Sequence, residues 1–338
     1  MIVIDGSQGE GGGQIFRSSL TLAMCLGKPV RIQKIRAGRP RPGLLRQHLT
    51  CVRAAQTISG AQVAGDELGS TEVTFKPGKV EAGEYRFSVG SAGSTSLVFQ
   101  TILMPLFFSE GESEVTFEGG THNGFSPSYD YIDQCFLPAI HGLGYRAKVE
   151  LDRFGFYPAG GGSWKASIMA VDSIRPIELV ERGQVIDTRA VATSSRIPEH
   201  INERELAQVK KKFFWPDESL QPRMVESEGP GNIVSLQIAS ENVTEVIEVV
   251  GEKKLSAERV AGRAIKSAKE YLEEGVPVGE HLADQLLLPM ALGNGGRFRT
   301  LRPSLHFLTN VDVIKHFLDV EIDVNQENNN VYTVSIVK

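Results

Sequence analysis

The order of the predicted elements recurs along this chain of 338 residues, and it constrains the fold more than any single motif does. Residues 2–76 are predicted to form strand, helix, strand, helix and two closing strands, a βαβαββ unit. Residues 85–170 repeat that order, and residues 281–337 supply helix, strand, helix and two strands once more. We therefore predict a mixed α/β (α+β) protein with three βαβαββ repeats. The alternative is a coincidence among common α/β units.

The spacing of the glycines that end helices predicts an insertion in the third unit. Gly27 and Gly111 are 84 positions apart, whereas Gly111 and Gly293 are 182 apart, which leaves a surplus of 98 residues. The third unit then begins with a strand at Pro176–Val180, and a smaller α/β domain separates that strand from the rest of the unit. The predicted core comprises residues 1–183 and 276–338, and the inserted domain comprises residues 184–275. Within the core, the first unit covers approximately residues 1–80, the second 81–172, and the third 173–183 together with 276–338.

A basic segment without any acidic residue lies near the N-terminus. The window Gly11–Gly65 holds nine Lys and Arg residues and neither Asp nor Glu, although the whole chain has 41 Asp+Glu and 36 Lys+Arg. The glycine-rich stretch Asp5–Gly13 comes just before it and leads into Arg17 on a predicted helix. Backbone N–H groups at a helix start and arginine side chains both bind anions, so we predict a phosphate site here. A solvated basic face is the alternative.

The overall composition limits the partners and the compartment. The net charge of −5 argues against unspecific coating of nucleic acid but allows a local patch that binds one phosphate-rich end. Three widely spaced cysteines, with Cys25 and Cys135 in apolar helical patterns, predict buried thiols and a reducing, cytoplasmic compartment. We expect no membrane partner, because the longest apolar helix candidate, Leu97–Phe108, is too short to span a bilayer. The sequence is compatible with an oligomer and carries no motif that fixes one.

Common cofactor motifs are absent from the sequence. It contains no HExxH, no paired CxxC and no GxxxxGK[ST], and the glycine-rich run does not fit the dinucleotide fingerprint. Glu10 and Asp284 are candidates to contact a nucleotide-bound Mg²⁺, which takes one or two carboxylates together with phosphate oxygens. Each could equally be a cap or turn residue.

Three loops hold equivalent positions in the predicted units, each before the second helix. They are Ala37–Pro42, Gly119–Ser128 with His122, and Arg302–Thr309 with His306. His306 is predicted to lie just before a helix that Thr309 or Asn310 caps. The positive end of a helix disfavours an imidazolium, so we expect a neutral His306, a possible nucleophile or general base. A structural role is the alternative for any single loop histidine.

Several segments, in order along nearly the whole chain, resemble the RNA 3′-terminal phosphate cyclase family. They are Glu10–Ser18, Arg36–Leu49, Gly90–Ser94, His122–Asn123, Gly155–Gly162, Glu228–Asn232, Val250–Lys253, Leu282–Met290 and Pro303–Asn310. The resemblance implies three repeats like the C-terminal domain of translation initiation factor three, with a smaller inserted α/β domain. It also implies ATP-dependent conversion of an RNA 3′-phosphate to a 2′,3′-cyclic phosphate, with Mg²⁺ or another divalent cation.

The resemblance also assigns roles to residues. His306 matches the nucleophile that becomes covalently bonded to AMP. The ATP-binding positions of the family match Gln100, His281, Leu282, Ala283, Asp284 and Gln285. The positions at the RNA and phosphate end match Glu10, Arg17, Arg36, Arg39, Gln47 and His48. Glu10 is also a candidate Mg²⁺ ligand. His281 departs from the family pattern, in which a tyrosine lies beside the nucleotide. Imidazole can also stack on adenine.

Two other functions are compatible with this architecture. The cyclase-like family includes a ribosome-assembly factor without the nucleophile, which makes a non-catalytic RNA-binding role the main alternative. His306 within an intact Pro303–Asn310 motif favours the catalytic branch. Enolpyruvate transferases share the repeat architecture, and only the arginines here would suit their carboxylate-bearing substrates.

Overall fold

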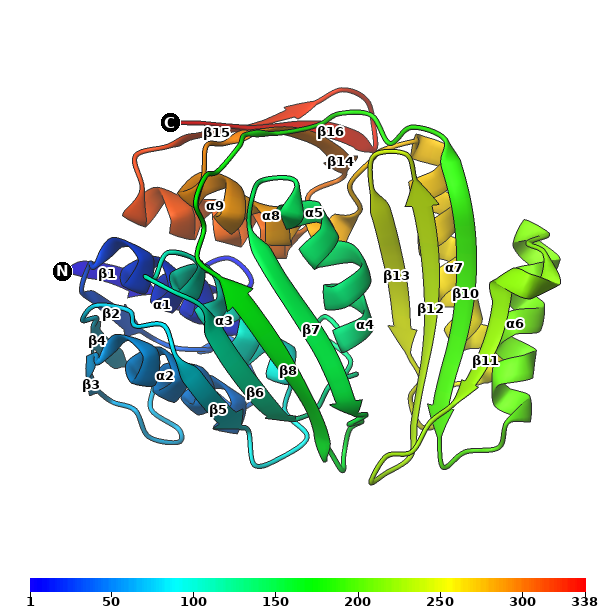
Figure 1. The fold of residues 1–338 in the computed structure, drawn as a ribbon, viewed down its shortest axis with the longest axis horizontal. Coiled ribbons are helices and arrows are strands. Elements are labelled where there is room, and N and C mark those ends of the chain that lie inside the picture. The colour runs from blue at the N-terminus through cyan, green and yellow to red at the C-terminus, as the bar shows by residue number, and fades with distance from the viewer.

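The computed structural model describes residues 1–338 and has four sheets of four strands each, with helices packed against them (Figure 1). The predicted mixed α/β class is confirmed. None of the helices has the length and apolar character that crossing a bilayer requires.

The first sheet has the order β1-β2-β4-β3, in which β1 and β2 run parallel and the other neighbours antiparallel. Its elements are β1 Ile2–Asp5, α1 Gly13–Leu26, β2 Val30–Gln33, α2 Arg46–Ser59, β3 Gln62–Ala64 and β4 Val73–Lys76. Gly27 ends α1 with a left-handed backbone, as expected of a glycine after a helix. Periodicity predicts a second helix from Gly43, but Gly43 has a left-handed backbone with φ +78°, and α2 begins only at Arg46.

The second sheet has the order β5-β6-β8-β7, again with one parallel pair, β5 and β6. Its elements are β5 Glu84–Ser88, α3 Thr95–Phe107, β6 Ser113–Gly119, α4 Tyr129–Tyr131, η1 Ile132–Phe136, α5 Leu137–His141, β7 Arg146–Arg153 and β8 Gly162–Met169. The sequence pattern predicts one helix over Tyr129–Leu143, whereas the structure has α4 and α5 separated by the π-helical turn η1. Pro138 has no N–H to donate to the carbonyl of Gln134, which favours such a turn. Phe108, rather than Gly111, caps α3.

The third sheet, of order β15-β16-β14-β9, brings together strands that are distant in the sequence. Its elements are β9 Ile177–Leu179, α8 Glu280–Leu292, β14 Gly296–Leu301, α9 Leu305–Phe317, β15 Glu321–Gln326 and β16 Val331–Val337. Leu179 pairs with Phe298 across the parallel β9–β14 contact. All the chain between β9 and α8 is therefore an excursion from this sheet.

That excursion forms the fourth sheet, of order β11-β10-β12-β13, with two helices on it (Figure 1). Its elements are β10 Val185–Ser195, α6 His200–Phe213, η2 Asp217–Ser219, β11 Leu220–Met224, β12 Gly231–Ser240, β13 Thr244–Val250 and α7 Ala257–Glu274. The edge strand β11 was not predicted, because it is polar and contains Pro222, which sheets accept only at an edge or a bulge.

The apolar interior divides into two clusters. One of 62 buried residues lies mainly within the first three sheets and their helices, and one of 16 lies mainly within the fourth. Cys51 and Cys135 are buried and Cys25 is partly buried, and none of the three forms a disulfide.

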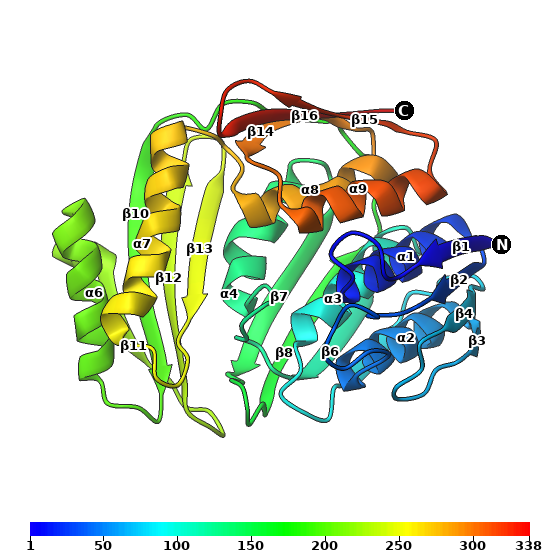
Figure 2. The ribbon, with the colours of Figure 1, turned by 180° about the vertical axis from the view of Figure 1, so that it is seen from behind.

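In Figure 2, α8 and α9 lie above α1 and α3, with α1 in contact with both α3 and α9. The starts of α1, α8 and α9 carry the site described next.

Candidate functional site

His306 is the second residue of α9, so the prediction that it precedes a helix starting near Asn310 is wrong. Ser304 caps this helix, and its hydroxyl accepts a hydrogen bond from the Phe307 N–H at 3.2 Å. Serine is a preferred N-cap because its oxygen satisfies an otherwise free N–H group of the first turn. Thr309, expected as a cap, instead lies inside the helix, where its hydroxyl donates to the Leu305 carbonyl.

The His306 imidazole is suited to remain neutral. Its side chain is 53% exposed. Partial burial lowers the pKa of His306, the nearby positive charge of Arg17 lowers it further, and His281 and Arg39 act in the same direction. The positive end of the α9 dipole also disfavours an imidazolium in the first turn. A neutral ring nitrogen is therefore accessible from solvent at the start of α9.

The glycine-rich loop after β1 packs directly on the start of α9. The Glu10 N–H donates to the Thr309 hydroxyl at 3.0 Å, and a Glu10 carboxylate oxygen lies 3.8 Å from His306 Nε2. Gly9 has φ +54°, and a Cβ there would lie 2.2 Å from Thr309 Oγ1. Only glycine allows this approach, and it brings Glu10 beside His306.

The Glu10 carboxylate is mostly buried and only partly paired. One oxygen contacts the Arg39 guanidinium. The other, Oε2, is buried without a hydrogen-bond partner and faces the backbone of Gly12. Buried carboxylate oxygens normally have partners, so this atom can accept a ligand. No group of three or more His, Cys, Asp or Glu side chains is arranged to hold a metal ion.

Asp284 of α8 connects α8 to α1 and to α9, the helix that carries His306. Its carboxylate accepts from the Asn310 side-chain amide at 3.2 Å and from Gln14 at 3.4 Å. Gln14 in turn accepts from Arg17 at 3.1 Å. Burial raises the pKa of Asp284 to about 6, against the opposing effects of the Asn310 hydrogen bond and the Arg17 charge. The structure thus gathers side chains of α1, α8 and α9 into one polar cluster.

The other ATP-binding positions that the resemblance assigned occupy different surroundings. Gln100 of α3 donates to Gln285 of α8 at 2.8 Å. Leu282 and Ala283 are buried in the core, where they hold α8 in place. His281 is exposed and lines a cavity of about 350 Å³ between the start of α8 and the fourth sheet. Ser304, the cap of the helix that carries His306, lines the same cavity.

Arg36, Gln47 and His48 make contacts that hold loops. Arg36 donates to the Gly43 carbonyl at 3.0 Å, and Gln47 accepts from the Ser94 N–H at 2.8 Å. His48 is buried, and its Nδ1 accepts from the Leu45 N–H at 3.2 Å. Burial, together with the charges of Arg17 and Arg36, lowers the pKa of His48 to about 3, so it is neutral. Gly13 lies against both His48 and Arg17, which links this group to the cluster below His306.

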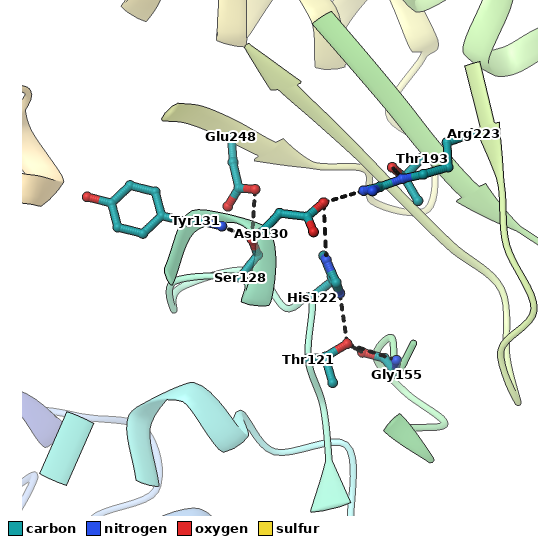
Figure 3. A network of polar contacts seen from close by, with 9 residues as sticks. All are labelled: Thr121, His122, Ser128, Asp130, Tyr131, Gly155, Thr193, Arg223 and Glu248. Atoms are coloured by element: carbon teal, nitrogen blue, oxygen red, sulfur yellow. Dashed lines mark hydrogen bonds and ion pairs between the residues drawn. The ribbon is translucent and has the colours of Figure 1, made fainter. Parts of the chain in front are cut away.

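His122 does not join His306, although its loop was predicted to hold an equivalent position. It is buried at the junction with the fourth sheet (Figure 3). Its Nδ1 lies 2.7 Å from the Thr121 hydroxyl, and its Nε2 lies 3.7 Å from the Asp130 carboxylate. Asp130 also pairs with Arg223 of β11. Burial alone would raise the pKa of Asp130, but His122 and Arg223 together hold it well below its ordinary range.

Several contacts of these clusters were not predicted from the sequence, which marked Thr309 and Asn310 only as candidate caps. Gln14, Thr309 and Asn310 contact Glu10 or Asp284, and Asp130 and Arg223 join the two cores. Gln14 and Asn310 stand within segments that carry the family resemblance, which was the only available signal. Asp130 and Arg223 are 93 positions apart, and no local pattern connects them.

Comparison with known proteins gives two findings. A family model described as RNA 3′-terminal phosphate cyclase matches residues 8–324. An RNA 3′-terminal phosphate cyclase of Koribacter versatilis (strain Ellin345) is 47% identical over 330 residues, which are 97% of this chain and 93% of that protein.

Proposed function

The chain belongs to the RNA 3′-terminal phosphate cyclase family, and we propose that it uses ATP to convert the 3′-phosphate of an RNA end to a 2′,3′-cyclic phosphate. The observation that carries the mechanism is the position of His306. Its half-exposed imidazole, with a lowered pKa, stands at the start of α9 beside the Glu10 carboxylate. The arrangement suits a nucleophile that attacks a phosphate held by glycine-rich backbone and arginines.

In the first step, a neutral nitrogen of His306 attacks the α-phosphorus of ATP. A P–N bond forms, the bond from that phosphorus to the bridging oxygen breaks, and pyrophosphate leaves. The lowered pKa of His306 keeps its lone pair available at neutral pH. Arg17 and Arg39, both close enough to influence that pKa, would stabilise the negative charge that develops on the phosphorus oxygens.

The remaining steps transfer and then release AMP. An oxygen of the RNA 3′-phosphate attacks the adenylyl phosphorus, the P–N bond breaks, and His306 leaves as a neutral imidazole whose other ring nitrogen carries the proton. The vicinal 2′-hydroxyl then attacks the 3′-phosphorus and loses its proton, while the P–O bond to AMP breaks. The cyclic phosphate closes because activation has replaced a poor leaving group by AMP.

We propose that the nucleotide lies between His306 and the start of α8. The cavity of about 350 Å³ lined by His281 and Ser304 supports this location. Asp284, Gln285 and Gln100 would contact the nucleotide, and Leu282 and Ala283 would act by fixing α8 in the core. Arg39 would meet the RNA phosphate, and Arg36, Gln47 and His48 would hold the loops around it.

Glu10 fits the role of a Mg²⁺ ligand, because its Oε2 is buried and unpaired. Because Glu10 is the one carboxylate within 4 Å of a His306 nitrogen, most ligands of the cation would be phosphate oxygens and water, as Mg²⁺ prefers. When bound, the cation would neutralise the phosphate charge. Glu10 also approaches His306 Nε2 and would orient the ring through that contact.

We also propose that the first three sheets are repeats of one unit and that residues 184–275 form an inserted domain. Each of the three sheets has one parallel pair and two antiparallel pairs in the same order. The separate apolar cluster of the fourth sheet supports a domain with its own core.

The function is tested by incubating the protein with ATP labelled at the α-phosphorus and a divalent cation. We expect covalently labelled protein, release of pyrophosphate, and conversion of 3′-phosphate RNA to the cyclic product. His306→Ala should abolish labelling, while His316→Ala, an exposed histidine near the end of the same helix, should label normally. Wild-type protein that binds RNA but never becomes labelled would instead support the non-catalytic RNA-binding role.

A further inference from the structure

Two large aromatic side chains are exposed at neighbouring loop tips. Phe125, between β6 and α4, is fully exposed, and Tyr157, in the turn between β7 and β8, is 76% exposed. His122 and Phe156 pair in a short parallel bridge, so the two loops leave the protein side by side. The β7–β8 turn lies at the lower edge of the molecule in Figure 1. Two large exposed rings on loops that are paired at His122 and Phe156 form a candidate binding surface.

A buried network holds both loops, so the rings are presented on rigid supports (Figure 3). The Gly155 N–H donates to the Thr121 hydroxyl at 3.0 Å, and the Gly155 carbonyl accepts from the Thr121 N–H at 2.9 Å. The His122 ring stacks on Phe154 with centroids 4.9 Å apart. Phe125 has φ +64°, an uncommon backbone conformation for a bulky residue, and its ring points into solvent.

Exposed arginines flank the rings. Arg153 donates to the Gly161 carbonyl in the Tyr157 turn, and Arg46 donates to the Gly90 carbonyl at 3.1 Å. The loop that begins at Gly90 is joined to the Phe125 loop, because the Asn123 amide donates to the Ala92 carbonyl at 2.6 Å. Arg153 is therefore attached to the Tyr157 turn, and Arg46 is attached to the loop that contacts the Phe125 loop.

These contacts also connect the rings to the proposed catalytic site. Gln47, next to Arg46, accepts from Ser94 in the same small-residue loop, and the loop before α2 carries Arg39, which pairs with Glu10. Glu10 lies 3.8 Å from His306. An RNA end bound at His306 can thus continue over a surface of arginines and small residues towards the two rings.

We propose that Phe125 and Tyr157, flanked by Arg46 and Arg153, form a stacking surface for unpaired nucleotides upstream of the RNA 3′-phosphate. Single-stranded nucleic acid is bound by aromatic side chains that stack on bases beside cations that follow the backbone, and this surface has both. The proposal rests on the proposed function, since that function brings an RNA end to His306.

The test is RNA binding without ATP, which does not depend on catalysis. The probe is a fluorescent single-stranded RNA of about ten nucleotides with a 3′-phosphate, within the site sizes of single-strand binders. Phe125→Ala and Tyr157→Ala should each raise the Kd about 5- to 150-fold, the cost of one lost base stack. Tyr157→Phe should bind as wild type does. Phe214→Ala, an equally large exposed ring on the fourth sheet's side of the molecule, should leave the Kd unchanged.

Labelling with ATP alone separates this proposal from the proposed function. Both alanine variants should label at the wild-type rate, because neither ring contacts His306. If the wild type fails to label while the two variants still lose RNA affinity, the cyclase mechanism is wrong and the stacking surface stands. Unchanged RNA affinity in both alanine variants overturns the surface, and so does a change in self-association without a change in RNA affinity.

Discussion

Replacing Glu245 by Gln should stabilise the protein at alkaline pH. Glu245 of β13 is 2% exposed, and its carboxylate accepts from the Gly279 N–H, at the cap of α8, at 2.7 Å. Burial raises its pKa from the ordinary 4.5 to about 7. At about 1.4 kcal/mol for each pH unit, this rise corresponds to about 3 kcal/mol spent on ionising Glu245 in the folded state. Gln keeps an oxygen for Gly279 and carries no charge.

The sign of the pH dependence follows from the raised pKa. Between about pH 4.5 and pH 7 the folded chain keeps a proton that the unfolded chain releases, so the cost is complete above pH 7 and disappears as the pH falls. Urea unfolding of the two proteins should show Glu245→Gln more stable by about 2–3 kcal/mol at pH 8. The difference should shrink below about 1 kcal/mol near pH 5.

A matched control separates burial from the loss of charge. Glu252→Gln removes an exposed carboxylate shortly after β13 and should change the free energy of unfolding by less than about 0.5 kcal/mol at either pH. A destabilised Glu245→Gln at pH 8, or a difference that does not change with pH, would refute the reasoning.

Two further predictions concern the loop and the nucleophile. Gly9→Ala should lose self-adenylylation and cost at least about 1–2 kcal/mol of stability, because alanine strains a left-handed backbone and its Cβ meets Thr309 Oγ1. The control is Gly38→Ala, where a Cβ would meet no atom within 4 Å. Equal behaviour of the two variants would show that the Gly9 contact does not position Glu10 and His306. Because the pKa of His306 lies below its ordinary value, the single-turnover labelling rate should be constant from pH 8 to below pH 6.5 and fall only in more acidic buffer. A labelling rate that already falls between pH 8 and pH 7 would mean that another group controls the step.

The elements that the sequence predicts well are those with local signals. Periodicity and the glycine after α1 predict the end of that helix at Leu26, and the apolar pattern Leu97–Phe108 lies within two residues of both ends of α3. The helix expected from residue 281 begins at Glu280. The start of α9 was misplaced because Thr309 and Asn310 resemble caps, whereas the earlier Ser304 has that role. Ser304, Thr309 and Asn310 are all residue types that cap helices, so residue type alone does not show which of them has that role.

The site was predictable only where a motif marks it. His306, Glu10 and Asp284 were singled out, and the structure shows the contacts that gather them, through Thr309, Asn310 and the left-handed Gly9. The junction of Asp130 with Arg223 could not be predicted, because it joins two separate cores. Long-range ion pairs of this kind leave no periodic pattern in a sequence.

The central claim is that the His306 imidazole becomes bonded to AMP. Tandem mass spectrometry of the protein after incubation with ATP and Mg²⁺, in the absence of RNA, tests it most directly. We expect one adenylyl group, on the peptide that contains Pro303–Asn310 and at its single histidine. An adenylyl group on any other residue, with His306 unmodified, would show that His306 is not the nucleophile.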